Sequence, residues 1–299
     1  MRKQISHSQH FSSNECPPTE SDPLCEHESF IKQEHQILRH SCAVSNCIFS
    51  ECTSSDNGGA ICFLSSGTFT VSSSSFDKCR TDIGYSGTTG GGAIFTNSSS
   101  QLSVTLTVFI DCVSSYSFGG AILGAPGSTS VEISLCSFIL CKADHGGGMS
   151  THHGPTCAVC SSRFVLCDCT HCGGGLFHNS LAGKEIAISD SLFKGNTARC
   201  SSSFAAGRGG GGFEDYRESI YESKYSFLFF SENNSPYGKG NEISLCQYPI
   251  ERENVLHCLT TRSSEAFWNT QTYGYVNWLH LVLLMYILNA ANDIITTAE

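Results

Sequence analysis

Apolar residues recur in a regular pattern between residues 41 and 248, and seven phenylalanines mark its period. For the first six, a Val or Ile stands five residues earlier, and a further apolar residue or Cys stands seven residues earlier. Apolar positions two residues apart, rich in β-branched side chains, predict short strands with one buried face. No helical period runs through this stretch. The phenylalanines recur at intervals of 26 to 37 residues and are Phe49, Phe76, Phe109, Phe138, Phe164, Phe193 and Phe230.

A repeat of this length predicts a solenoid, in which each strand pairs with its equivalent in the next coil. Coils of a parallel β-helix stack about 4.8 Å apart, so every inward column becomes a ladder of like side chains. Each buried Phe contributes about 1.5–3 kcal/mol, and stacking adds about 0.5–1.5 kcal/mol per pair. We predict an all-β fold: a parallel β-helix of six to seven coils over 41–248, an N-terminal segment 1–40 without a clear pattern, and a C-terminal cap or anchor over 249–299.

Two further columns accompany the phenylalanines. A glycine pair, as in "GGAI" at 58, 91 and 119, marks a sharp turn, because glycine adopts positive φ without steric cost. Cys or Asn stands three residues after each Phe. Neighbouring Cys in such a column are close enough for disulfides, but an odd number of Cys and the presence of Asn favour a small turn-capping residue. The column is Cys52, Cys79, Cys112, Cys141, Cys167, Asn196 and Asn233.

The spacing between the motifs indicates which part of each coil varies. The distance from the glycine pair to the next Phe is nearly constant, whereas the distance from Phe to the next pair is not. In solenoids, insertions form loops on one face, which is often the binding face. The two longest insertions are Thr81–Gly90 and Thr197–Gly210. We expect the second to contact a partner through Arg199, Cys200 and Arg208.

The alternation of "GGAI" with Phe-x-x-Asn resembles the repeats of the chlamydial polymorphic outer membrane proteins, which also occur in surface proteins of some protists. The resemblance spans about 42–243, and "GKGNEI" at 238–243 is similar to that family's last repeat. Most coils carry Cys where the family has Asn. The resemblance implies a right-handed β-helix of the pectin-lyase type, secreted or displayed at the cell surface, with adhesion to a protein or glycan ligand as its usual role.

Composition narrows the class of partner. The chain carries 17 Lys and Arg against 27 Asp and Glu, which excludes the basic surface of a nucleic-acid-binding protein. Hydrophobic residues make up 40% of the chain, which excludes wholesale disorder. The 18 cysteines favour an oxidising compartment, although no apolar stretch of a signal peptide follows the basic N-terminus.

Clustered Cys and His residues between 141 and 178 suggest metal binding as one alternative. Two Cys-x-x-Cys pairs occur there, and Cys160, Cys169, His171 and Cys172 are the candidate zinc ligands. The eight-residue gap between the pairs is short, and the other interpretation is that these cysteines fill core positions as small hydrophobic residues. We therefore expect no metal and no cofactor.

β-helix enzymes that act on polysaccharides need clustered carboxylates. The two columns that follow Phe hold no acids in adjacent coils, so we expect no catalytic residues, although a polysaccharide lyase or hydrolase is the main alternative. The first of these columns instead places Ile110, Ile139 and Val165 next to each other on an outer face. Such a stripe is either a partner-binding surface or a face covered by a terminal segment.

The C-terminal residues 273–299 contain an apolar run, Leu281–Leu288, interrupted on both sides by polar residues. A membrane-spanning helix needs about 20 apolar residues, so a capping helix is expected, with membrane association as the alternative. Together these features predict a non-enzymatic, adhesin-like scaffold that binds a protein or glycan at a cell surface. A polysaccharide-degrading enzyme and a Cys/His-rich metal-binding module are the alternatives.

Overall fold

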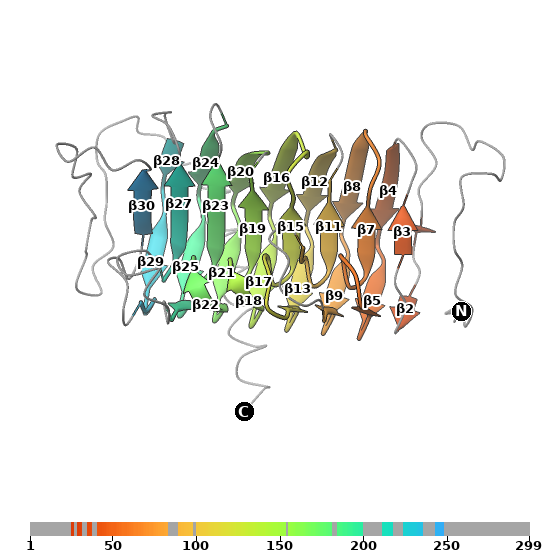
Figure 1. The fold of residues 1–299 in the computed structure, drawn as a ribbon, viewed down its shortest axis with the longest axis horizontal. Helices are drawn as coiled ribbons and strands as arrows, with labels where there is room; N and C mark the ends of the chain where they lie inside the picture. Colours follow the sequence, from red (N-terminus) through yellow and green to blue (C-terminus); the bar gives the residue numbers. More distant parts are fainter. Residues whose placement is uncertain are drawn as a thin grey trace, which may run out of the picture. The chain divides into compact units, whose positions relative to one another are not determined.

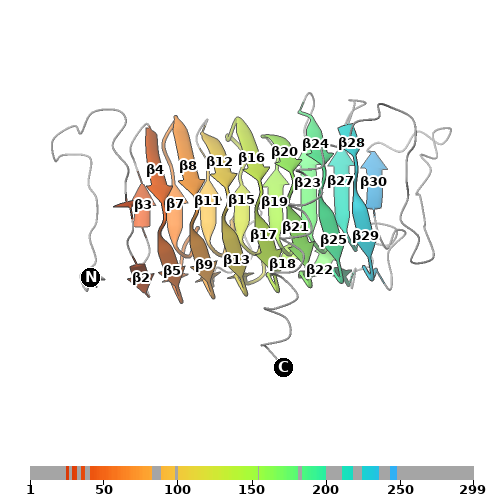
Figure 2. The same cartoon turned by 180° about the vertical axis from the view of Figure 1, so that it is seen from behind.

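The computed structural model describes residues 25–26, 29–31, 35–37, 41–82, 89–97, 100–153, 155–180, 184–199, 211–217, 224–235 and 243–247. Their regular structure is entirely strands, and every pairing is parallel. The chain forms a parallel β-helix, as the repeat predicts. Figures 1 and 2 show the coils stacked in chain order, with equivalent strands of successive coils side by side.

The strands form four sheets, numbered here in the order in which one coil visits them. Sheet 1 contains β1 (Cys25–Glu26), β4 (Ser41–Ser45), β8 (Thr68–Ser72), β12 (Gln101–Thr105), β16 (Ser130–Ser134), β20 (Thr156–Cys160), β24 (Ile186–Ser189) and β28 (Lys224–Ser226). Sheet 2 contains β2 (Ser29–Ile31), β5 (Ile48–Ser50), β9 (Ser75–Asp77), β13 (Val108–Ile110), β17 (Ser137–Ile139), β21 (Arg163–Val165), β25 (Leu192–Lys194) and β29 (Phe229–Ser231).

Sheets 3 and 4 complete each coil. Sheet 3 contains β6 (Thr53–Ser54), β10 (Arg80–Thr81), β14 (Val113–Ser114), β18 (Lys142–His145), β22 (Asp168–Cys172) and β26 (Thr197–Ala198). Sheet 4 contains β3 (His35–Ile37), β7 (Ile61–Phe63), β11 (Ile94–Thr96), β15 (Ile122–Gly124), β19 (Met149–His152), β23 (Leu176–Ser180), β27 (Phe213–Arg217) and β30 (Ile243–Gln247). The solenoid thus begins at β1, before residue 41, whereas segment 249–299 lies outside the described residues.

The seven phenylalanines form a continuous stack inside sheet 2. Their strands pair in register, Phe on Phe, from β5 to β29. Ring centroids of successive members lie 4.6 to 5.3 Å apart, with nearly parallel planes. The first six rings are at most 1% exposed, whereas Phe230 is half-buried. The stack is therefore continuous and becomes more open at its last member.

The column that follows Phe caps the corner between sheets 2 and 3. All five of its cysteines carry reduced thiols, so no disulfide joins successive coils along it. Four of these thiols donate to the Phe carbonyl of the preceding coil, as Cys167 does to Phe138 at 3.5 Å. Asn196 makes the equivalent bond to Phe164 at 2.9 Å through its amide nitrogen. Cys and Asn therefore share one hydrogen-bonding role at this corner.

Glycine pairs turn the chain from sheet 3 into sheet 4. The first glycine has positive φ, for example 64° at Gly119. The second lies against the next coil, and a Cβ on Gly120 would be 2.0 Å from the carbonyl oxygen of Gly147. In two later coils the turning pairs are Gly146-Gly147 and Gly173-Gly174.

The two corners that flank sheet 2 turn without glycine in most coils. Positive φ occurs at Asn46 and Leu106 between sheets 1 and 2, and at Glu51 and Leu140 between sheets 2 and 3. A non-glycine residue in this region is uncommon. The regular inter-coil ladder supports it at equivalent positions throughout the described solenoid.

Candidate binding face

The corner between sheets 3 and 4 is where the coils differ most in length. The insertion Thr81–Gly90 joins β10 to β11, and Thr197–Gly210 leads from β26 to β27. Only the ends of these loops, 81–82, 89–90 and 197–199, are described. Both variable loops therefore leave the solenoid at the same corner, which makes this corner the candidate binding face.

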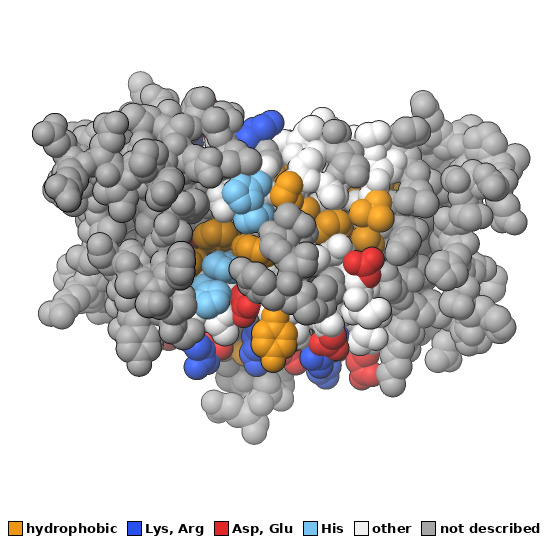
Figure 3. Space-filling view, in the orientation of Figure 1, with side chains coloured by type: hydrophobic (Ala, Val, Ile, Leu, Met, Phe, Trp, Pro, Cys, Tyr) orange, Lys and Arg blue, Asp and Glu red, His pale blue; other side chains and the backbone are white. Residues whose placement is uncertain are grey.

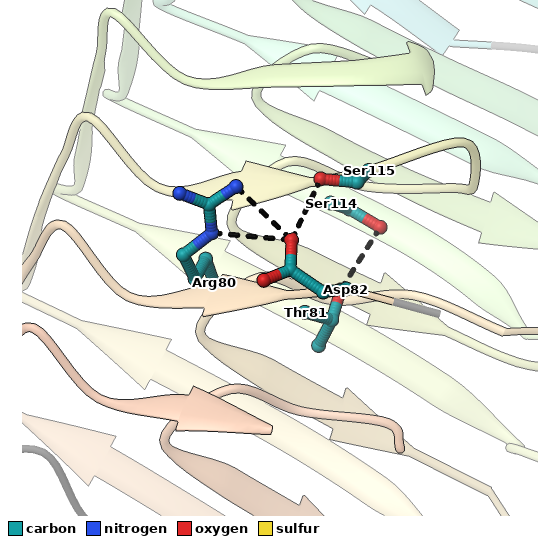
Figure 4. Close-up of polar contacts among 5 residues, drawn as sticks. All are labelled: Arg80, Thr81, Asp82, Ser114 and Ser115. Carbon is teal, nitrogen blue, oxygen red and sulfur yellow. Dashed lines mark hydrogen bonds and ion pairs between the residues drawn. The ribbon is translucent and has the colours of Figure 1, made fainter. Parts of the chain in front are cut away.

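A charged edge on sheet 3 supports the first insertion. Arg80 donates to Asp82 Oδ1 from Nε at 3.2 Å and from Nη2 at 3.0 Å. Ser115, one coil further, donates to the same oxygen at 3.0 Å (Figure 4). Beneath them, the buried Thr81 hydroxyl donates to Ser114 at 3.3 Å. Bonds between coils thus fix the residue at which the loop departs.

The second insertion begins with an ion pair of the same kind. Arg199, expected to contact a partner, holds the carboxylate of Asp168 in the preceding coil. Its Nε donates to Oδ1 at 3.0 Å and its Nη2 to Oδ2 at 2.7 Å, and hydrogen bonding to this carboxylate raises the pKa of the guanidinium. The side chain is exposed, so a partner could still reach it. Cys200 and Arg208 lie outside the described residues.

Beside this edge, side chains from the corner between sheets 3 and 4 and from the outer side of sheet 4 form what we call the outer cluster: Phe118, His145, Ser150, His152, Phe177 and Asn179. Phe118 stacks on His145 with ring centroids 4.8 Å apart and lies 4.3 Å from the ring of His152. His145 in turn lies 5.1 Å from Phe177. Figure 3 shows histidine side chains beside hydrophobic ones on one face, with charged side chains along the edge below.

Alternation along β19 and β23 determines which side chains reach this cluster. Met149 and Leu176 point into the solenoid core, so the next residues, Ser150 and Phe177, point outward. His152 and Asn179 pair two positions further along and share the outward side. The two strands thus place an aromatic ring and three polar side chains on one outer surface.

Burial controls the charge of the cluster. His152 is 8% exposed. Burial, assisted by the neighbouring His153, lowers its pKa from an ordinary value of 6.5 to about 3. His152 is therefore neutral at physiological pH. One of its ring nitrogens donates a hydrogen bond and the other accepts one, and the tautomer decides which is which.

The sequence contained a signal for part of this cluster. The residue just before the turning glycine pair is Phe118, His145 or Cys172 in three successive coils, and these positions pair between coils. Phe118 and His145 stack because neighbouring coils bring their rings to 4.8 Å. His145 and His152 belong to the Cys- and His-rich stretch between 141 and 178, but nothing in the sequence predicts their contacts with Phe118 and Phe177.

The four metal-ligand candidates belong to two different sheets. Cys160 ends β20 in sheet 1 and is exposed, whereas Cys169, His171 and Cys172 lie on β22 in sheet 3. Cys169 and Cys172 are buried. Among the described residues, no group of three or more His, Cys, Asp or Glu side chains is placed to hold a metal ion.

The apolar stripe on sheet 2 is partly exposed in one coil and buried in the other two. Ile110 is partly exposed, but Ile139 and Val165 are only 6% and 5% exposed. Arg163, on the same outer side, is also buried and donates from Nε to the hydroxyl of Ser137 at 2.7 Å. In this structure the stripe is therefore not an open surface across all three coils.

Comparison with known proteins identifies no relative. No protein-family model, no curated protein and no solved structure matches the chain significantly. Within the described part of the chain, no helix is long and apolar enough to cross a membrane, and residues 273–299 lie outside that part. What is shown is a parallel β-helix scaffold with its variable loops and the outer cluster gathered at one corner.

Proposed function

We propose that the chain is a non-enzymatic, adhesin-like scaffold, secreted or displayed at a cell surface, that binds a protein or glycan through the corner between sheets 3 and 4. The observation that carries the proposal is the separation of a regular core from variable loops. Ladders of equivalent side chains hold the coils in place, while insertions of different length leave the solenoid at one corner. Exposed charged and aromatic side chains lie at the same corner, among them Tyr116, which is 70% exposed. Surface loops on a rigid scaffold are the usual place for recognition.

The resemblance of the repeats to chlamydial polymorphic outer membrane proteins supports the same role. The repeated "GGAI" and the Cys or Asn column occur at fixed positions of the coil, where they turn the chain and cap a corner. Because the repeated residues have these structural roles, the loops between them are free to differ from coil to coil.

The experiment compares binding of the full chain to intact cells and to a glycan array with binding of a variant in which residues 200–209 are replaced by a short Gly-Ser linker. We expect the full chain to bind and the variant to lose most of that binding, with an unchanged melting temperature. An antibody should also label the protein on unpermeabilised source cells. Labelling that requires permeabilisation, together with no binding to any cell or glycan, would overturn the proposal.

A further inference from the structure

Three polar side chains of the outer cluster each have a buried atom without a hydrogen-bond partner. Ser150, His152 and Asn179 are 0%, 8% and 7% exposed. Neither Ser150 Oγ, His152 Nδ1 nor Asn179 Oδ1 makes a hydrogen bond. Buried polar groups in native proteins are almost always paired, and leaving one unpaired costs about 1–3 kcal/mol. Three such atoms on two neighbouring strands need an explanation.

The solenoid itself does not require these polar groups. At the position of Ser150, the two preceding coils carry Leu123 and Phe95 on the same outward column. These two residues belong to an apolar cluster that also contains Phe118 and Phe177. An apolar side chain at Ser150 would therefore extend a surface that already exists. On this outward side, buried polar residues are Ser150 and His152 on β19, Asn179 on β23, and Glu214 on β27, which follows Phe177 in the same column.

The cluster combines these polar atoms with flat apolar rings. Phe118 lies 4.3 Å from the ring of His152 and 6.3 Å from Phe177. Two partly exposed rings lie beside these buried groups: the ring of His145 is 4.8 Å from Phe118, and that of His153 is 4.0 Å from His152. Binding sites for small molecules combine mainly apolar and aromatic walls with a few polar groups that orient the ligand.

The unpaired atoms define the chemistry of the ligand. Asn179 Oδ1 can only accept, the Ser150 hydroxyl can donate and accept, and a neutral His152 ring offers one donor or one acceptor at Nδ1. A ligand with several neighbouring hydroxyl groups matches all three. The arginines of the adjacent edge, Arg80 and Arg199, are already paired with carboxylates, which disfavours an acidic ligand.

We propose that the outer cluster is a binding site for a neutral sugar ring, whose hydroxyl groups pair with Ser150, His152 and Asn179 and whose apolar face lies against Phe118 and Phe177. This inference rests on the proposed function, because it specifies the class of ligand that the scaffold binds. It places the sugar beside the corner from which the variable loops depart.

The test measures binding of the full chain to D-glucose, D-galactose, D-mannose and N-acetyl-D-glucosamine by titration calorimetry, with D-glucuronic acid as the acidic comparison. We expect at least one neutral sugar to bind and the acid to bind more weakly. Asn179→Ala and Ser150→Ala should each weaken binding by about tenfold, equivalent to about 1.4 kcal/mol. Their melting temperatures should stay equal or rise, because each change removes an unpaired buried polar atom. Ser103→Ala, on the outer side of sheet 1, is the matched control and should change neither quantity.

The outcomes separate this site from the proposed function. If the full chain binds glycans but Asn179→Ala and Ser150→Ala bind them unchanged, the site is wrong and the proposed function stands. A marked fall in melting temperature in both variants would give these side chains a structural role and would also overturn the site. If the full chain binds neither sugars nor cells, both proposals fail.

Discussion

Asn196 Oδ1 accepts the backbone N–H of Cys167 at 2.9 Å, a bond that links two successive coils at the corner between sheets 2 and 3. The same side chain donates from Nδ2 to the carbonyl of Phe164 and to Asn233 Oδ1, both at 2.9 Å. One amide therefore satisfies buried groups in the coils on either side of it. A thiol at the equivalent position offers only a weak donor and a weak acceptor.

Extending this amide ladder by one coil should stabilise the protein. In Cys167→Asn, the new Nδ2 can replace the 3.5 Å thiol contact with the Phe138 carbonyl. We expect the free energy of unfolding to rise by about 1 kcal/mol, the usual value of one added hydrogen bond. Urea unfolding followed by circular dichroism measures the change. The reverse substitution, Asn196→Cys, should lower it, and a fall in both variants would show that Cys and Asn are not interchangeable here.

The phenylalanine stack should be most sensitive in its middle. Phe138 is fully buried between Phe109 at 4.9 Å and Phe164 at 4.6 Å. Phe138→Ala leaves a cavity and should cost about 3–5 kcal/mol. Phe230→Ala, at the half-buried last ring, should cost clearly less. Denaturant unfolding of the two variants provides the comparison. Equal losses of unfolding free energy would show that a buried middle ring contributes no more to stability than the half-buried last one.

Much of the fold could be predicted from the sequence because the solenoid repeats its interactions. Phe, the capping Cys or Asn and the glycine pair each perform the same task in every coil, so their spacing reveals the parallel β-helix. The glycine-free corners were not predicted. Residues as different as Glu51, Lys78 and Leu140 adopt positive φ there, and no side-chain type marks such a turn.

The outer cluster was harder to predict, since it depends on contacts between coils. Phe118 and His152 are far apart in the sequence, and their rings meet only because neighbouring coils stack. For the same reason, sequence proximity does not show where the metal-ligand candidates lie in the coil. Cys160 and Cys169 are nine residues apart, but the chain passes from sheet 1 through sheet 2 to sheet 3 between them.

The two kinds of glycine should respond differently to substitution. A Cβ on Gly120 would lie 2.0 Å from the Gly147 carbonyl oxygen, which only a backbone shift can relieve. Gly195 has a φ of 64°, but its Cβ would meet only the flexible end of Leu166, at 2.7 Å. We expect Gly195→Ala to cost about 1–2 kcal/mol, and Gly120→Ala to yield little soluble folded protein. Similar melting temperatures for the two variants would contradict this difference.

Thiol reactivity should distinguish the cysteines by burial. Cys160 is the exposed one among the reduced cysteines that the structure describes. Burial raises the pKa of Cys136 and of Cys157 to about 12, so neither forms the reactive thiolate near neutral pH. Brief treatment of the native protein with iodoacetamide, followed by peptide mass spectrometry, should modify Cys160 first. Equal modification of Cys136 in the native state would contradict the buried position.

Acidification should destabilise the protein through His152. Its pKa is about 3 in the folded chain against an ordinary 6.5, so below pH 6.5 the unfolded chain takes up a proton that the folded chain excludes. The free energy of unfolding therefore falls as the pH drops from 6.5 towards 3, by up to about 1.4 kcal/mol per pH unit from this group. His152→Gln should flatten that part of the profile, measured by urea unfolding at several pH values. Ser103→Ala, whose side chain does not titrate and lies on sheet 1, should reproduce the slope of the unmodified protein, and a His152→Gln profile parallel to both would exclude His152 as the source.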